Sequence, residues 1–234
     1  LSLKLESSHY IGSYGPFLLD GYFAFSDFKS WGTGQNNGFE ACIEECKAGK
    51  CFLDVGAHIG LVTMPAAKAV GQKGSVHAFE PGKSNFKILE RHLILNDLEN
   101  VVANQVICGD ENRTVDFFEL DKPNGRNTLV HSERALGYDR TKRVQITLDS
   151  YVINAGIAPD IIKIDVEGAE VAVLRGLLKT LKRFQPTIFL SVHPAELEQL
   201  SNGFERLEEV IKEIDYVPLN IDGSPFCGWK NSEF

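Results

Sequence analysis

The sequence predicts an α/β fold, in which a mostly parallel β-sheet is covered by helices on both faces. Short apolar runs, bounded by Gly, Pro, Asp or Asn, alternate along the chain with stretches whose apolar residues recur three and four positions apart. Such alternation is typical of parallel sheets with helical crossovers. The chain has 234 residues, 43% of them hydrophobic, which suits one α/β domain. We expect residues 1–49 to form an N-terminal cap and residues 50–234 to form the core of that domain.

The elements follow in order along the core. Strands are predicted over CFLDVG (51–56), SVHAFE (75–80), VVANQVICG (101–109), IIKIDV (161–166) and PTIFLSVH (186–193). Helices are predicted over residues 61–70, 84–96, 170–184 and 204–214. Near the end, YVPLN and PFCGW flank a turn with Asp222-Gly223, which predicts an antiparallel hairpin at one edge of the sheet.

Two segments interrupt the alternation. Residues 1–38 are rich in Gly, Ser and aromatics, contain the flexible stretch SWGTGQNNG (30–38), and precede a predicted helix over 39–47. After a predicted strand, TVDFFEL (114–120), the polar segment 121–143 carries Asn127, His131, Arg134 and Arg140. We interpret this segment and residues 30–38 as a wall facing the substrate; a solvated surface loop is the alternative.

Composition narrows the classes of partner. Twenty-four basic against 32 acidic side chains give a net charge of −8, which argues against nucleic acid as the main partner. No apolar run is long enough to span a membrane and residues 1–20 lack a secretion signal, so we expect a cytoplasmic location. The chain starts at Leu1 without a methionine, so the alternative is an upstream segment that this sequence does not include. The five cysteines are odd in number and scattered, which favours reduced thiols.

The end of the first core strand predicts a ligand site. Gly56 permits a sharp turn and Gly60 a close approach of the next helix, so backbone N–H groups are free at the carboxyl edge of the sheet. A dinucleotide fingerprint would have glycine where His58 stands, which argues against a diphosphate. Asp54 favours a ligand with positive charge, such as an ammonium or a sulfonium.

The second strand ends in another acid. Glu80 lies where nucleoside-binding α/β folds place a carboxylate that accepts hydrogen bonds from both ribose hydroxyls. Alternatively, Glu80 only starts a turn before Pro81 and Asp54 only caps a helix. The joint arrangement of two strands, two acids and two glycines favours a nucleoside ligand.

The chain resembles the FkbM-type class I S-adenosylmethionine-dependent methyltransferases. The resemblance is carried by LDVGAHIGLVT (53–63), HAFEPGKSNFKILERHLILN (77–96), VICGDEN (106–112), ITLDSYV (146–152) and IIKIDVEGAEVAVLRGL (161–177). It implies a three-layer, Rossmann-like methyltransferase sheet of seven mostly parallel strands, with the C-terminal hairpin supplying the reversed strand. It also implies S-adenosylmethionine as cofactor and O-methylation of a hydroxyl on a sugar or other small metabolite.

The resemblance also implies roles for individual residues. Asp54, Gly56, His58 and Gly60 would line the methionine part of the cofactor, Thr63 would donate to its carboxylate and Glu80 would hold the ribose. Asp110 would receive the adenine amino group, or would only form the turn in GDEN.

Catalysis is expected at the ends of the fourth and fifth core strands. Asp165 and Glu167 end one strand and His193 the next. Oxygen methylation needs a base for the hydroxyl proton, and histidine suits that role near neutral pH, with a carboxylate to orient it. The alternatives are a structural histidine and helix-capping acids. No spacing demands a metal, although these three residues would offer hard ligands.

Two other functions fit parts of the sequence. An NAD-dependent oxidoreductase would share the first two strands but requires the glycine that His58 replaces. A non-catalytic nucleoside-binding module would keep the cofactor acids and lose the acceptor pocket. The sequence does not specify the methyl acceptor or the oligomeric state.

Overall fold

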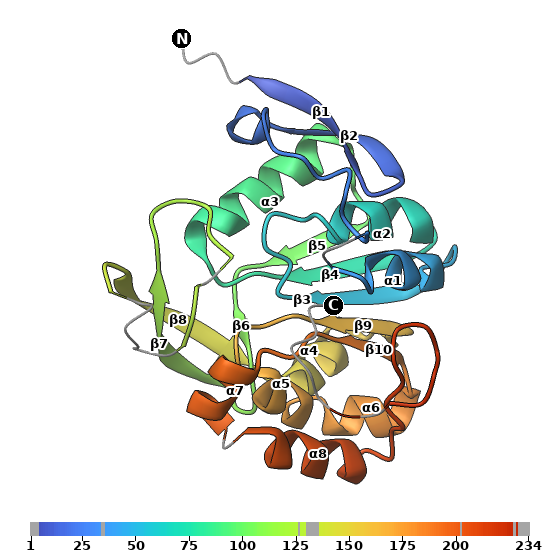
Figure 1. Ribbon diagram of the computed structural model, residues 1–234, viewed down its shortest axis with the longest axis vertical. Helices are drawn as coiled ribbons and strands as arrows, with labels where there is room; N and C mark the ends of the chain where they lie inside the picture. Colours follow the sequence, from blue (N-terminus) through green and yellow to red (C-terminus); the bar gives the residue numbers. More distant parts are fainter. Residues whose placement is uncertain are drawn as a thin grey trace.

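The computed structural model describes residues 5–33, 36–125, 127–129, 136–201, 203–226 and 228 (Figure 1). Its central sheet has five parallel strands in the order β10-β9-β3-β4-β5. Their bounds are β3 Cys51–Val55, β4 Ser75–Phe79, β5 Val101–Asn104, β9 Ile161–Ile164 and β10 Thr187–Leu190. The predicted α/β class with a parallel sheet is therefore confirmed.

Helices cover both faces of this sheet and make three layers (Figure 1). On one face lie α1 Phe39–Glu45, α2 Thr63–Val70 and α3 Lys83–Leu95; on the other lie α4 Leu148–Ala155, α5 Glu170–Arg175, α6 Leu178–Phe184, α7 Pro194–Ser201 and α8 Gly203–Glu213. Successive side chains of a strand point to opposite faces of the sheet. Phe52 therefore packs in the first core, between the sheet and α1–α3, whereas Leu53 and Val55 pack in the second core, between the sheet and α4–α8. Among the described residues, no helix is long and apolar enough to cross a membrane.

The strand count differs from the seven predicted. The predicted strand over 101–109 divides into β5, in the central sheet, and β6 Ile107–Cys108, which joins a second sheet in the order β6-β8-β7. The division follows Asn104, whose side-chain amide donates to the carbonyl oxygens of Ala78 and Val102 at 3.2 and 3.1 Å. The chain leaves the central sheet at this point.

The other two strands of the second sheet are β7 Arg113–Glu119 and β8 Asp139–Ile146, paired antiparallel. Residues 139–143, which the sequence predicts to be loop, therefore belong to a strand. At the C-terminus the described residues form one isolated antiparallel bridge, between Leu219 and Pro225, and no strand of the central sheet. Residues 227 and 229 of the predicted hairpin lie outside the described residues.

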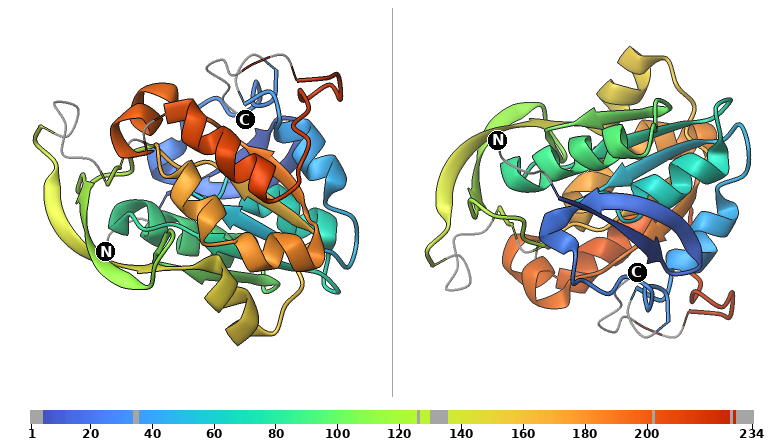
Figure 2. Two further views of the ribbon diagram at one scale, coloured as in Figure 1. Left: turned by 90° about the horizontal axis from the view of Figure 1, so that it is seen from below. Right: turned by 90° about the horizontal axis from the view of Figure 1, so that it is seen from above.

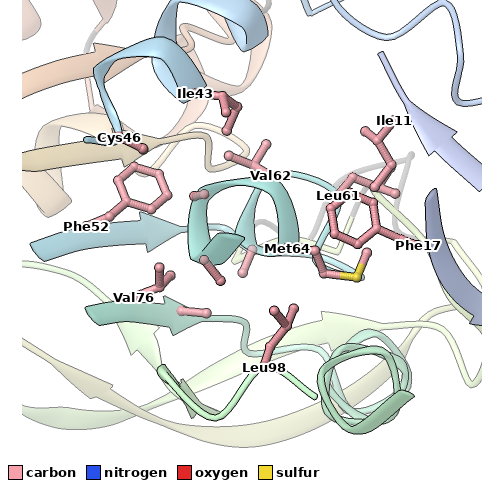
Figure 3. Packing of buried hydrophobic residues seen from close by; sticks show 14 of the residues in the cluster. Ile11, Phe17, Ile43, Cys46, Phe52, Leu61, Val62, Met64, Val76 and Leu98 are labelled. Atoms are coloured by element: carbon pink, nitrogen blue, oxygen red, sulfur yellow. The ribbon is translucent and has the colours of Figure 1, made fainter. Parts of the chain in front are cut away.

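The N-terminal cap contains a hairpin that the sequence analysis missed. Strands β1 Glu6–Ile11 and β2 Tyr14–Asp20 pair antiparallel and are followed by a 3₁₀ turn over Gly21–Phe23. The hairpin lies beyond α3, on the opposite side of the molecule from α8 (Figures 1 and 2). Its side chains Ile11 and Phe17 point toward Leu61 and Met64 (Figure 3) and are buried in the first core.

Candidate functional site

A cavity of about 380 Å³ opens at the carboxyl ends of β3, β4 and β9, and its size is typical of small-molecule sites. Its lining includes six residues that the sequence singles out: Gly56, His58, Glu80, Asp165, Glu167 and His193. Parallel strands place their carboxyl ends at one edge, which brings these residues together although they are far apart in the chain.

Three other predicted cofactor residues lie behind the cavity rather than on its surface. Asp54 is fully buried; its Oδ2 accepts a hydrogen bond of 2.6 Å from the Thr63 hydroxyl, and its Oδ1 lies 3.2 Å from Lys163 Nζ. Thr63 thus directs its hydroxyl proton to Asp54 and away from the predicted cofactor carboxylate. Gly60, with φ of +92°, packs against Leu89. These residues shape the loop that borders the cavity.

Lys163 joins the first and fourth core strands. Its Nζ donates to the carbonyl oxygen of Gly56 at 2.8 Å and lies 3.5 Å from Asp165 Oδ2. Burial lowers the pKa of Lys163, but the charges of Asp54 and Asp165 outweigh burial and raise it above its ordinary value. Gly56 has φ of +82°, and a β-carbon there would overlap the carbonyl oxygen of Asp165. The two strand ends are therefore in direct contact.

His58 occupies the middle of the glycine loop with a left-handed backbone, φ 51°. Its backbone N–H donates to Glu80 Oε2 at 2.9 Å, and its Nε2 is buried without a hydrogen-bond partner. Burial, and then the charge of Lys163, lower the pKa of His58 to about 4. The ring is therefore neutral near pH 7 and presents an unsatisfied nitrogen among the cavity residues.

Glu80 is buried at the start of the turn after β4. Its Oε1 accepts hydrogen bonds from Gly82 N at 2.8 Å and Asn85 Nδ2 at 3.2 Å, in addition to the bond from His58 at Oε2. Burial raises the pKa of Glu80 to about 7, although these donors and Lys163 act in the opposite direction. The carboxyl group is thus close to its titration point at neutral pH.

His193 lies at the centre of a group of carboxylates. Its Nδ1 is 2.8 Å from Oε1 of the buried Glu170, and its Nε2 is 3.6 Å from Asp165 and 3.9 Å from Glu167. Burial lowers the pKa of His193, but the bond to Glu170 and the nearby carboxylates raise it to about 9 overall. The resting imidazole is therefore mostly protonated at neutral pH, contrary to the near-neutral titration that the sequence suggests.

Asp110 does not line the cavity. Its side chain is 42% exposed and lies 3.9 Å from the guanidinium of Arg113 and 3.4 Å from Gln145 Nε2. The cavity is instead bordered in this region by the side chains just before it, Val106, Ile107 and Cys108. The structure gives Asp110 no contact with the other predicted cofactor residues.

The two irregular segments both reach the cavity. Trp31 and Asn36 line it from the N-terminal cap, and residues 124, 125 and 127–129 line it from the polar segment after β7. Arg140, in contrast, forms an ion pair with Asp116 on the second sheet and is absent from the lining, whereas His131 and Arg134 lie outside the described residues. The sequence signal was the irregular, polar character of both segments.

Asn85 is a lining residue that sequence reasoning missed. It lies in the first turn of α3, next to Lys83 and Ser84, where an asparagine is expected to face solvent. The side chain is instead buried, and its Nδ2 donates to Glu80. Among the described residues, no group of three His, Cys, Asp or Glu side chains is placed to hold a metal ion.

Most of the chain resembles a known protein family. Residues 54–218 match the family model described as the Methyltransferase FkbM domain. Methyltransferase 1 of Beauveria bassiana (strain ARSEF 2860) is 27% identical over 144 residues, which cover 54% of this chain and 57% of that protein. Methyltransferase sdnD of Sordaria araneosa is 29% identical over 155 residues, covering 54% and 60%. The chain thus spans less than two thirds of the length of either relative.

A solved structure, that of methyltransferase FkbM from Methylobacillus flagellatus KT, is 18% identical, with a TM-score of 0.46 over 70% of this chain and 37% of that one. Because the family model matches more than half of the residues, including the Asp54 loop, Glu80 and the His193 group, the chain belongs to the FkbM methyltransferase domain family.

Proposed function

We propose that this chain is an S-adenosylmethionine-dependent methyltransferase that methylates a hydroxyl oxygen on a sugar or another small metabolite. The observation that carries the proposal is that Glu80 and the group around His193 line the same cavity, at the carboxyl edge of the central sheet. Family membership identifies S-adenosylmethionine as the cofactor, which supplies an electrophilic methyl group on a sulfonium. Glu80 would hold the ribose of the cofactor.

The cavity residues fit such a cofactor. A ribose hydroxyl donates to a carboxylate, and Glu80 offers one on the cavity surface. The unsatisfied Nε2 of His58 would accept or donate a hydrogen bond to the polar methionine end, depending on its tautomer. Asp165 and Glu167 add negative charge to the lining, which favours a positively charged sulfonium.

His193 is the group we propose to accept the hydroxyl proton. Since Glu170 Oε1 lies 2.8 Å from Nδ1, the neutral ring keeps its proton on Nδ1 and leaves a lone pair on Nε2. Nε2 faces Asp165 and Glu167, which would orient the acceptor and stabilise the imidazolium that forms. Only the small neutral fraction of His193 at pH 7 would serve as base, because the pKa is about 9.

Trp31 supports the choice of a small, oxygen-bearing acceptor. Trp31 contributes an aromatic ring to the lining, and its Nε1 is buried without a partner. A buried donor in this state is satisfied when a ligand oxygen approaches it. The lining therefore offers an apolar surface and unpaired polar groups together, as a hydroxylated metabolite requires.

Two measurements test the proposal. Titration calorimetry should detect binding of S-adenosylhomocysteine and no comparable binding of NAD. Transfer of a labelled methyl group should then be followed over a panel of monosaccharides and hydroxylated metabolites, with Asp165→Asn as the inactive control. Tight binding of NAD would contradict the cofactor; cofactor binding without transfer to any hydroxyl in the panel would favour a nucleoside-binding module.

A further inference from the structure

The side-chain Nδ2 of Asn127 is buried and has no hydrogen-bond partner among the described residues. Its Oδ1 faces two donors, the backbone N–H of Leu120 at 3.4 Å and Asn124 Nδ2 at 3.3 Å. A backbone N–H can only donate, so the atom that faces Leu120 is the oxygen and the Nδ2 group is turned the other way. That Nδ2 is buried without a hydrogen bond, and Asn127 lines the cavity.

The free amide lies beside Glu80. A β-carbon built on Gly82 would come within 2.5 Å of Asn127 Nδ2 and 2.7 Å of Glu80 Oε1. Both groups therefore lie against the same side of Gly82, close enough for a single hydroxyl group to contact both. This position is at the ribose end of the proposed cofactor site and not beside His193.

The backbone around Asn127 is held at this place by several bonds. Asn85 Nδ2 donates to the carbonyl oxygen of Asn124 at 2.8 Å, and its Oδ1 accepts from Asn124 N at 2.9 Å. Thr128 exchanges two backbone hydrogen bonds with Phe118 on β7, at 2.9 and 3.0 Å. Since Asn85 also donates to Glu80, one asparagine joins the segment to the ribose-binding acid.

We infer that Asn127 is a further binding residue of the nucleoside site, where it donates to the oxygen of a ribose hydroxyl whose proton Glu80 accepts. The inference rests on the proposed function, because it takes the ligand to be S-adenosylmethionine. A hydroxyl group donates one hydrogen bond and accepts others, so a carboxylate and an amide N–H together satisfy it. A carboxylate alone accepts the hydrogen bond of the hydroxyl group and leaves the lone pairs of the hydroxyl oxygen without a donor.

This assignment changes the role that the sequence suggests for the polar segment. As part of an acceptor-facing wall, Asn127 would alter the KM of the acceptor and leave cofactor affinity unchanged. As part of the nucleoside site, it alters cofactor affinity, and the effect depends on one ribose hydroxyl. These two consequences are separable by binding measurements without any acceptor.

The test is titration calorimetry with S-adenosylhomocysteine and with its 2′-deoxy and 3′-deoxy analogues. Asn127→Ala should weaken S-adenosylhomocysteine binding about 3- to 10-fold, the usual effect of one neutral hydrogen bond. With the analogue that lacks the contacted hydroxyl, wild type and Asn127→Ala should bind equally. Asn127→Asp, which keeps the shape and removes the donor, should weaken binding at least as much and guards against a packing effect of the alanine.

Lys122→Ala is the control, because Lys122 is exposed in the same segment; its affinity should equal that of wild type. Unchanged S-adenosylhomocysteine affinity in both Asn127 variants overturns the inference, as does an equal loss with all three ligands. Failure of wild type to bind S-adenosylhomocysteine would instead overturn the proposed function, and the inference with it.

Discussion

Glu80 is buried and accepts hydrogen bonds from three N–H donors, and burial raises its pKa to about 7. If Glu80 holds the ribose, as we propose, cofactor binding depends on pH. Ribose hydroxyls donate to the ionised carboxylate, so protons compete with the ligand below that pKa. We expect the affinity for S-adenosylhomocysteine to be roughly tenfold weaker at about pH 6 than at about pH 8, and to level off above pH 7.

Calorimetry across this range provides the measurement. Glu80→Gln should bind weakly at every pH and lose the dependence, whereas Glu111→Gln, an exposed acid, should retain it. A flat profile in the wild-type protein would show that Glu80 is ionised throughout and has no proton-linked role.

His193 leads to a second pH prediction. If the neutral ring accepts the hydroxyl proton, the single-turnover methylation rate should rise about tenfold per pH unit and reach half its maximum near the pKa of about 9. His193→Ala should be about a hundred- to ten-thousandfold slower, with a flat profile. A rate that is already maximal at neutral pH would assign the proton to a carboxylate or to solvent.

Glu170→Gln separates the base from its surroundings. The buried carboxylate of Glu170 raises the pKa of His193, so its amide should move the midpoint of the rate profile to lower pH while the profile keeps its shape. The same midpoint in this variant would mean that another group controls the profile.

The sequence identified those cavity-lining residues whose proposed role follows from their position at the end of a strand. Glu80 and Gly56 could be predicted because a strand end, an acid and a glycine have meaning in the one-dimensional order. Asn127 was named only as part of a polar segment, since its position against Gly82, next to Glu80, depends on how that segment folds back over Gly82. Asp110 was misplaced because the chain leaves the central sheet after Asn104, before the strand end that the prediction required.

At the scale of elements, Asn96 adds two hydrogen bonds to the attachment of the β1–β2 hairpin to α3, beside the contacts of Arg91 and His92 with Asp20. Asn96, just after α3, accepts from Leu18 N and donates to Leu18 O, both at 2.8 Å, as a neighbouring strand would. Asn96→Ala should lower the free energy of unfolding by about 1 to 3 kcal/mol. It should also speed proteolysis within residues 5–20.

Urea unfolding and timed proteolysis measure these effects. The matched control is Glu90→Ala, an exposed position on the same helix, which should change neither. Equal cleavage rates in Asn96→Ala and wild type would mean that the packing of Ile11 and Phe17, together with the bonds from Arg91 and His92 to Asp20, holds the hairpin without Asn96.

The missed elements share a physical cause. In the hairpin, burial alternates over part of each strand on either side of Gly12-Ser13, but the sequence there is rich in Gly, Ser and aromatic residues and suggests an irregular segment. β8 is strongly polar because most of its outward side chains meet solvent, so its composition suggests a loop. Hydrophobic pattern predicts buried strands well and half-exposed strands on small sheets poorly.

At the scale of the whole molecule, the cavity lies where segments from both ends of the domain meet. Trp31 comes from the cap, and His193 from the connection between β10 and α7. A ligand that binds only the folded state at 100 times its Kd adds about 2.7 kcal/mol. S-adenosylhomocysteine at that concentration should therefore raise the Tm by roughly 5 to 10 °C.

Calorimetric or fluorescence melting curves check this shift. The increase in Tm should be smaller in Glu80→Gln at the same ligand concentration. Homocysteine, which lacks the adenosyl group, should not change the Tm. A wild-type Tm that does not respond to S-adenosylhomocysteine would contradict a preformed cofactor site.

The contacts of His92 indicate where the folding unit begins along the chain. Its Nδ1 donates to the carbonyl oxygen of Ile59, in the glycine loop, and its Nε2 accepts from Asp20 N in the hairpin, at 2.8 and 3.0 Å. The family match starts at residue 54. A fragment that begins there would lack the backbone N–H of Asp20, which donates to His92, and would expose the part of the first core that Leu19 covers. Similarity marks the shared chemistry, whereas an autonomous, crystallisable or transplantable module of this protein must also carry its first strands.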